Sequence, residues 1–353
     1  MYFQQEYSVI EFKLQDNWGT QFSYDGPHNV TMQLRGPTEE EARRGHKAPD
    51  TFVVALCEWE PGVAIRDMFA SLSRNVLPEG SDKPKGKSAR FIDQAGRISE
   101  SYVPPLELMP RPMISLVEQV DRELSDYANR TIRVLRWVHS VGLQHRGLSR
   151  QSFTWSVDGE TWKPVPSTGS LHASIYTTGF WISDRQRDYT VELVKQGVDE
   201  PLSHVLCREA RQEQVHVNYR SALLLGIAAA EVGIKMFISD VLPDTVWLVE
   251  NMPSPDIVKI LREYLPKVPS RRAGSPKVVI PEPIINRLKD ARDRRNRLSH
   301  TGKVTIDRND LDEWMSAIVD LLWLLDYYRG YDWAISHVRK ETGDLLGERT
   351  PEG

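Results

Sequence analysis

The stretch Leu223–Val232, with the sequence LLLGIAAAEV, decides how the C-terminal half of this 353-residue chain is interpreted. Leucine, isoleucine and alanine occupy most of its positions, so the helix that it predicts has no wide polar face. Apolar surface is unfavourable in water, and a helix that is apolar on most sides is therefore covered by its neighbours. The stretch predicts a central helix surrounded by other helices.

Further helices are expected around this central one, because the pattern becomes helical from about Glu213. Ser254 and Pro255 form a start signal, with serine as the N-cap and proline at the first helical position, for a helix that ends near Leu265. A helix over about 283–299 follows, and the last long helix begins near Asp310. Four main helices with mostly short connections favour an antiparallel bundle, which we assign to residues 205–345.

Residues 1–195 show a different pattern, in which apolar and polar side chains alternate in short segments between Gly, Pro, Asn and Asp. This alternation predicts strands. Asp158-Gly159 predicts a two-residue hairpin turn between strands. The expected strands are 7–14, 30–34, 52–56, 153–157, 160–165 and 172–176, and one long helix is expected over about 114–141. The predicted fold class is α+β, with a mixed β-rich regulatory or recognition domain before the bundle.

Composition and cysteine usage exclude several classes of protein. With 40% hydrophobic and 27% charged residues, the chain has enough apolar material for folded cores. No segment approaches the roughly 20 apolar residues of a membrane span, and the N-terminus lacks a secretory pattern, so a cytoplasmic protein without a membrane role is expected. Cys57 and Cys207 form no CxxC pair, and the nine histidines show no HxxxH spacing. We therefore predict no metal site and no cofactor.

Charge is unevenly distributed along the chain. Lys259–Lys303 contains 13 Lys and Arg against 4 Asp and Glu, a balance of +9, which leaves −4 − 9 = −13 for the rest. Clustered basic residues neutralise phosphates and release counterions, so this segment suits a polyanion such as RNA. The alternative is a solvated basic helix face that acidic neighbours offset.

The sequence Arg294–His300, RRNRLSH, lies within this basic segment near the end of a predicted helix. Projected at about 100° per residue, Arg295 falls inside the apolar stripe of the helix, whereas Arg292, Arg294 and Arg297 diverge from it. The stripe is formed by Ile284, Leu288, Ala291 and Leu298. We expect Arg292, Arg294 and Arg297, together with Arg271 and Arg272, to contact RNA.

The residue types around Arg295 suit phosphate chemistry. A guanidinium can grip two phosphate oxygens and stabilise developing negative charge. Histidine exchanges a proton near neutral pH, which makes His300 a candidate general base or acid, and Asn296 lies one turn before it and can orient the imidazole or bind substrate. The structural alternative is that Arg295 snorkels or pairs with a carboxylate, for which Glu231 in the central helix is available.

The pattern Arg295-Asn296 followed after three residues by His300, late in a helical hairpin, resembles the active-site motif of the HEPN superfamily of helical-bundle proteins. The resemblance covers roughly residues 212–340. It implies a metal-independent ribonuclease in which Arg295, Asn296 and His300 are catalytic and Glu231 supports Arg295. It also implies a homodimer, because one histidine does not readily serve as both base and acid, and two motifs would then share one cleft.

Modules of this family are common in toxin–antitoxin and phage-defence systems, so abortive infection, with a trigger or antitoxin partner, is the expected context. One alternative is a non-catalytic HEPN-like module that binds nucleotide or protein partners. Another is a scaffold without a nucleic-acid role. In an unbroken helix, the five residues from Arg295 to His300 turn the side chains about 140° apart. A shared site therefore requires the helix to loosen at Ser299 or a second subunit to supply the missing group.

Overall fold

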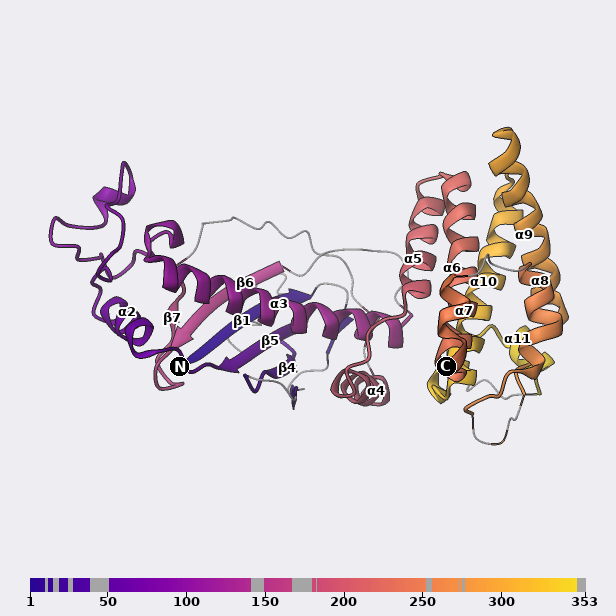
Figure 1. The fold of residues 1–353 in the computed structure, drawn as a ribbon, viewed down its shortest axis with the longest axis horizontal. Coiled ribbons are helices and arrows are strands. Elements are labelled where there is room, and N and C mark those ends of the chain that lie inside the picture. The colour runs from indigo at the N-terminus through magenta and orange to yellow at the C-terminus, as the bar shows by residue number, and fades with distance from the viewer. Residues whose placement is uncertain are drawn as a thin grey trace. The chain divides into compact units, whose positions relative to one another are not determined.

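The computed structural model confirms the α+β fold class, with an antiparallel sheet in the N-terminal part and helices in the C-terminal part (Figure 1). The chain forms two compact units, Met1–Leu135 with His145–Asp199, and Arg136–Gln144 with Glu200–Gly353. The structure describes residues 1–9, 12–14, 19–24, 28–38, 51–140, 149–166, 180–181, 183–251, 256–272, 274 and 277–347. The strand expected over 172–176 lies outside these residues.

The N-terminal unit contains a six-stranded sheet in the order β3-β4-β5-β1-β6-β7, in which all neighbouring strands are antiparallel. Its strands are β1 Tyr2–Val9, β3 Gly19–Ser23, β4 Thr31–Arg35, β5 Thr51–Glu58, β6 Ser149–Ser156 and β7 Lys163–Pro164. A separate parallel pairing joins β2 Phe12–Lys13 to β8 Phe180–Trp181. The expected strands over 30–34 and 52–56 are confirmed as β4 and β5. Buried and partly exposed side chains alternate along β4, whereas most side chains of β5 are buried.

The predicted long helix is confirmed as α3, Arg111–Val138, which runs along the sheet in Figure 1. The main apolar positions of the helix are all buried: Leu116, Val120, Leu124, Ile132, Leu135 and Val138. Polar groups also join it to the sheet, since Ser125 lies 2.9 Å from the Tyr7 hydroxyl and Asp121 accepts a hydrogen bond from Gln5. The unit also contains two helices that the sequence pattern does not predict, α2 Val63–Ser73 and α4 Asp184–Lys195, and short 3-10 turns η1 Ser88–Arg90 and η2 Leu106–Leu108.

The predicted hairpin between β6 and β7 is confirmed, but the prediction that its turn has two residues is wrong. Thr154 pairs with Pro164 and Trp155 with Lys163, so residues 157–162 form a longer connection. The cause is Asp158, whose carboxylate accepts hydrogen bonds from the amides of Glu160 and Thr161, both at 2.9 Å, and stabilises a broader loop. These hydrogen bonds lower the pKa of Asp158 to about 2.

Four long helices dominate the C-terminal unit and lie side by side in Figure 1. They are α5 Leu202–Val215, α6 Tyr219–Val241, α9 Glu282–Thr301 and α10 Arg308–Arg329. The expectation that helices begin near Glu213 is wrong, because α5 starts at Leu202. Its buried face includes Ser203, His204 and Arg208, and this polar face hides the helical periodicity of apolar residues.

The predicted central helix is confirmed as α6, which packs against α5, α9 and α10. Two glycines allow α10 to approach, since a Cβ atom at Gly233 would lie 2.5 Å from Leu322 Cδ2 and one at Gly226 would lie 2.8 Å from Met315 Sδ. The order of these contacts shows that α6 and α10 run in the same direction. Among the described helices, α6 alone is long and apolar enough to cross a membrane, and 56% of its most apolar window is buried inside the protein. Packing inside the bundle therefore accounts for its apolarity.

The helix expected after Ser254 starts differently from the prediction. Residues 252–255 lie outside the described part, and Asp256 is the N-cap, since its carboxylate accepts from the amides of Val258 and Lys259. One α-helical turn then widens into a π turn. The remaining elements of this unit are η3 Pro243–Thr245, α7 Val246–Asn251, α8 Ile257–Lys259, the π turn η4 Ile260–Tyr264, η5 Leu265–Lys267, η6 Asp332–His337 and α11 Lys340–Leu345.

Candidate functional site

Helix α9 carries the Arg-Asn-xxx-His motif and ends one residue after it. The predicted apolar stripe of this helix is confirmed, because Ile284, Leu288, Ala291 and Leu298 are all buried. Gly302 adopts a left-handed conformation with φ of 63°, and its amide donates to the Leu298 carbonyl at 2.9 Å. A residue with a side chain adopts this conformation at a cost, so Gly302 fixes the C-terminus of the helix directly behind His300.

The side chain of Arg295 is partly buried and forms an ion pair with Glu231 on α6. The exposed fractions of the two side chains are 28% and 32%, so water reaches both. A pair in such an environment contributes roughly 0–1 kcal/mol to stability. The pair therefore does more to orient the Arg295 guanidinium than to hold α9 on α6.

Asn296 and His300 lie on a common side of α9, one helical turn apart. The side chain of His300 is exposed and that of Asn296 is half-buried. Within the described ranges, neither side chain has a hydrogen-bond partner or an ion-pair partner. Both are available to a ligand or a second protein chain.

Of the two arrangements that could bring Arg295 and His300 to one site, the structure bears on the one in which α9 loosens at Ser299. Helix α9 continues without a break to Thr301, and the Thr301 hydroxyl donates to the Arg297 carbonyl at 2.8 Å, as expected of an intact last turn. The helix therefore does not loosen at Ser299. In one chain, Arg295 and His300 diverge by about 140°.

The five arginines expected to contact RNA do not form one surface. Arg292, Arg294 and Arg297 lie on α9 with the motif, and Arg292 is engaged by Asp256 and by Asp293, at 2.7 Å from the latter. In the part of the chain that is described, the side chains of Arg294 and Arg297 have no partner. These two guanidinium groups are free to attract an anion.

Arg271 and Arg272 lie at the other end of the bundle. The Arg271 amide donates to the Tyr328 carbonyl, near the C-terminus of α10, and its side chain donates to the Asp240 carbonyl at the C-terminus of α6. Arg272 lies over the Tyr327 ring, 4.3 Å from its centroid. His300 precedes the start of α10, and that helix has 22 residues, which at about 1.5 Å per residue separates the two groups by roughly 30 Å.

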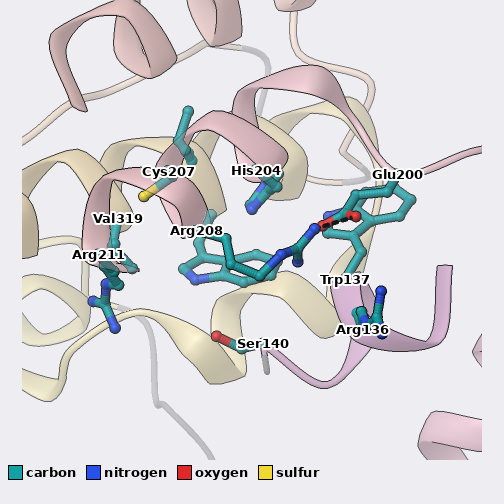
Figure 2. A pocket seen from close by; sticks show the side chains of 11 residues that line it. Arg136, Trp137, Ser140, Glu200, His204, Cys207, Arg208, Arg211 and Val319 are labelled. Carbon is teal, nitrogen blue, oxygen red and sulfur yellow. Dashed lines mark hydrogen bonds and ion pairs between the residues drawn. The ribbon is translucent and has the colours of Figure 1, made fainter. Parts of the chain in front are cut away.

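A buried polar cluster that the sequence did not indicate lies between α5, α10 and the end of α3, all within the C-terminal unit. Asp326 is almost fully buried, and one of its oxygens lies 2.6 Å from His204 Nε2 and accepts from Trp137 Nε1 at 3.0 Å. Beside it, Arg208 reaches toward Glu200 and pairs with it at 2.5 Å (Figure 2). Histidine beside aspartate is also a catalytic pattern, so this cluster requires a separate test.

The space beside this cluster is too small for a substrate. The cavity has a volume of about 40 Å³, which suits water rather than a metabolite. Cys207 lines it, and burial raises the pKa of its thiol to about 11, which keeps the sulfur protonated and unreactive at neutral pH. We interpret the cluster as structural.

The described residues contain no group of three or more His, Cys, Asp or Glu side chains that could hold a metal ion. Comparison of the chain with family models, with curated proteins and with solved structures gives no match.

Proposed function

We propose that the C-terminal bundle is a ribonuclease of the HEPN type that cleaves RNA by attack of the 2′-hydroxyl and needs no metal. The observation that carries this proposal is the placement of Arg295, a partly buried arginine oriented by Glu231, on the same helix as an exposed and unengaged His300. The bundle of four long helices in which α9 lies agrees with the fold that the resemblance implies.

In the proposed reaction, His300 removes the proton from the 2′-hydroxyl, and the 2′-oxygen attacks the adjacent phosphorus. The bond from phosphorus to the 5′-oxygen breaks, and the leaving oxygen takes a proton from a second acid. The products are a 2′,3′-cyclic phosphate and a free 5′-hydroxyl. Arg295 stabilises the charge on the phosphate oxygens during attack, and Asn296 holds the imidazole or the substrate.

The unbroken α9 helix supports a composite site in a homodimer. Since Arg295 and His300 of one chain point apart, the arginine of one protomer would act with the histidine of its partner. The second histidine would then serve as the acid that protonates the leaving group. In this arrangement Arg294 and Arg297, which have no partner among the described side chains, steer the RNA toward the cleft.

The biological role that fits such an activity is that of a toxin or phage-defence effector in the cytoplasm. The N-terminal unit, with its sheet and α3, would then sense a trigger or bind an antitoxin. The second candidate function is a non-catalytic module that binds nucleotide or protein. It is favoured by the same divergence of Arg295 and His300, because a single chain has no complete catalytic site.

One assay separates the two functions. The full chain is incubated with labelled single-stranded RNA in excess chelator and compared with Arg295→Ala, His300→Ala and Lys289→Ala, the last an exposed residue of α9 outside the motif. Cleavage by the parent and by Lys289→Ala alone, with cyclic phosphate ends, supports the nuclease. Binding without cleavage in all four proteins favours the module. Growth arrest on expression, lost in His300→Ala, is the readout that does not require the trigger to be known.

A further inference from the structure

A second cavity lies in the C-terminal unit, between α6, α7, α8 and the π turn η4. Its volume is about 430 Å³, within the range of small-molecule sites, which is roughly 300–1,000 Å³. The cavity is open to solvent and is large enough to hold a small molecule.

The wall of this cavity is mainly apolar. Ile234 and Ile238 come from α6, Leu248 and Val249 from α7, and Ile257 and Ile260 from α8 and the π turn. Leu248 and Tyr264, which also line it, are 47% and 41% exposed, unusually high for side chains of this size. Covering this surface with hydrocarbon would remove apolar area from water, which is favourable.

Three lysines, Lys235, Lys259 and Lys267, give the cavity a positive charge. Two carboxylates also line the cavity, and one of them, Glu231, is paired with Arg295. Glu263 is then the one remaining negative charge among the lining residues, beside three positively charged ammonium groups. Across the ranges that the structure describes, none of these ammonium groups has an ion-pair or hydrogen-bond partner. An anionic group on the ligand would complement this excess of positive charge.

The π turn is an independent observation that points to a ligand. Ile260–Tyr264 forms five residues of π-helix, a rare conformation that is frequent at functional sites. It contributes Ile260, Glu263 and Tyr264 to the cavity wall. The widened turn thus brings an apolar, a charged and an aromatic side chain to one cavity.

We propose that this cavity binds a small amphipathic anion, with its hydrocarbon part against the isoleucines of α6 and α8 and its carboxylate or phosphate group at the lysines. The cavity shares Glu231 with the candidate site, but Arg295, Asn296 and His300 do not line it, and the proposal stands whether or not the bundle cleaves RNA. Its chemistry requires both parts of the ligand, since the apolar wall and the lysines lie in one cavity.

The test is calorimetric titration of the full chain with decanoate below its micelle-forming concentration, and with decanol as the uncharged analogue. Two variants alter the site: the double variant Lys235→Ala with Lys259→Ala removes charge, and Ile260→Trp fills the cavity. Lys289→Ala removes an exposed lysine of α9 that does not line the cavity and is the control; its exposure matches that of Lys259, whereas Lys235 is half-buried. Circular dichroism of each variant measures whether it is folded.

Decanoate is expected to bind the parent and Lys289→Ala with equal affinity, and the double lysine variant about tenfold or more weakly, which corresponds to about 1.4 kcal/mol. Decanol is expected to bind the parent about tenfold more weakly than decanoate, and Ile260→Trp is expected to bind neither. Absence of decanoate binding to the parent overturns the proposal. So do equal affinities for decanoate and decanol, or binding that the folded double lysine variant retains in full.

Discussion

The carboxylate of Glu231 and the guanidinium of Arg295 meet across two helices, α6 and α9, between which residues 242–281 intervene in the chain. The contact gives the conspicuous arginine of the motif a fixed direction. Under the proposed function, Glu231 would be a positioning residue that acts on the substrate through Arg295.

Glu231→Gln is expected to lower RNA cleavage by about tenfold or more, because the guanidinium loses the charge that orients it. The free energy of unfolding should change by less than about 1 kcal/mol, since both side chains reach water. Cleavage rates and urea unfolding measure the two effects. Glu231→Asp should restore part of kcat, which a purely structural role would not predict. Equal activity of Glu231→Gln and the parent would remove Glu231 from the site.

A composite site predicts that activity depends on association. The cleavage rate per chain should rise with protein concentration until the dimer is saturated, because each site needs Arg295 and His300 from different protomers. Analytical ultracentrifugation over the same concentrations gives the fraction of dimer for comparison. A strictly monomeric protein that still cleaves RNA would contradict the shared site.

The buried pair of Glu200 and Arg208 predicts a stability effect without a direct effect on the motif. Their side chains are 0% and 8% exposed, so Glu200→Ala leaves a buried charge uncompensated and should cost about 3–5 kcal/mol. Urea unfolding measures this cost. Arg308→Ala, which breaks the exposed pair with Asp312, is the control and should cost no more than about 1 kcal/mol.

Two half-buried histidines of the C-terminal unit predict a loss of stability in acid. Burial and the proximity of His337 lower the pKa of His139 to about 4, and burial lowers the pKa of His337, which also faces His204, Asp326 and the Val138 carbonyl. The folded state thus favours neutral imidazoles, whereas the unfolded chain binds protons below about pH 6.5. Stability is complete above that pH and falls as the pH drops toward 4.

For His139 alone the loss reaches about 3.5 kcal/mol below pH 4, of which about 2 kcal/mol is present at pH 5, since each pH unit between the pKa values of the unfolded and folded chains corresponds to about 1.4 kcal/mol. Urea unfolding at pH 7.5 and pH 5 measures it, and His139→Asn should flatten the pH dependence. His216→Asn, an exposed residue after α5, should leave it unchanged. Identical slopes for the parent and His139→Asn would assign the acid sensitivity to other groups.

Close packing of α6 on α10 predicts that Gly233→Ala destabilises the protein. Alanine favours a helix by about 1 kcal/mol over glycine. The new methyl group, however, would overlap the buried Leu322, a clash that typically costs about 1–3 kcal/mol. Gly226→Ala meets the flexible Met315 instead and should be milder. Thermal unfolding of the two variants shows which of them is destabilised more. A Gly233→Ala variant more stable than the parent would show that α10 has room to shift.

The sequence predicts elements whose buried face is apolar and fails where that face is polar. Helices α3 and α6 follow from their apolar positions, whereas α5 buries serine, histidine and arginine. The partner of His204, Asp326, lies 122 residues further along the chain. Helix α4 is absent from the elements expected above, although Ser183 and Gln186 form a capping box, a local signal that the sequence does contain.

The same distinction applies to the candidate site. The stripe of α9 and the availability of Glu231 for Arg295 follow from helical geometry. The engagement of Arg292 by Asp256 depends on residues 36 positions apart, and the distance of Arg271 from the motif depends on where the bundle places its loops. Such relationships arise only when the chain is folded.

Asp256 uses both of its carboxylate oxygens for different elements. One accepts from the amides of Val258 and Lys259 at the start of α8, and the other pairs with Arg292 on the motif helix. A molecule that displaces α8 and an anion that draws Arg292 away therefore act on the same side chain. By thermodynamic linkage, any effect of the first on the affinity for the second equals the effect of the second on the first. Asp256 would thus couple ligand binding in the cavity to anion binding by Arg292, with the same coupling free energy in both directions.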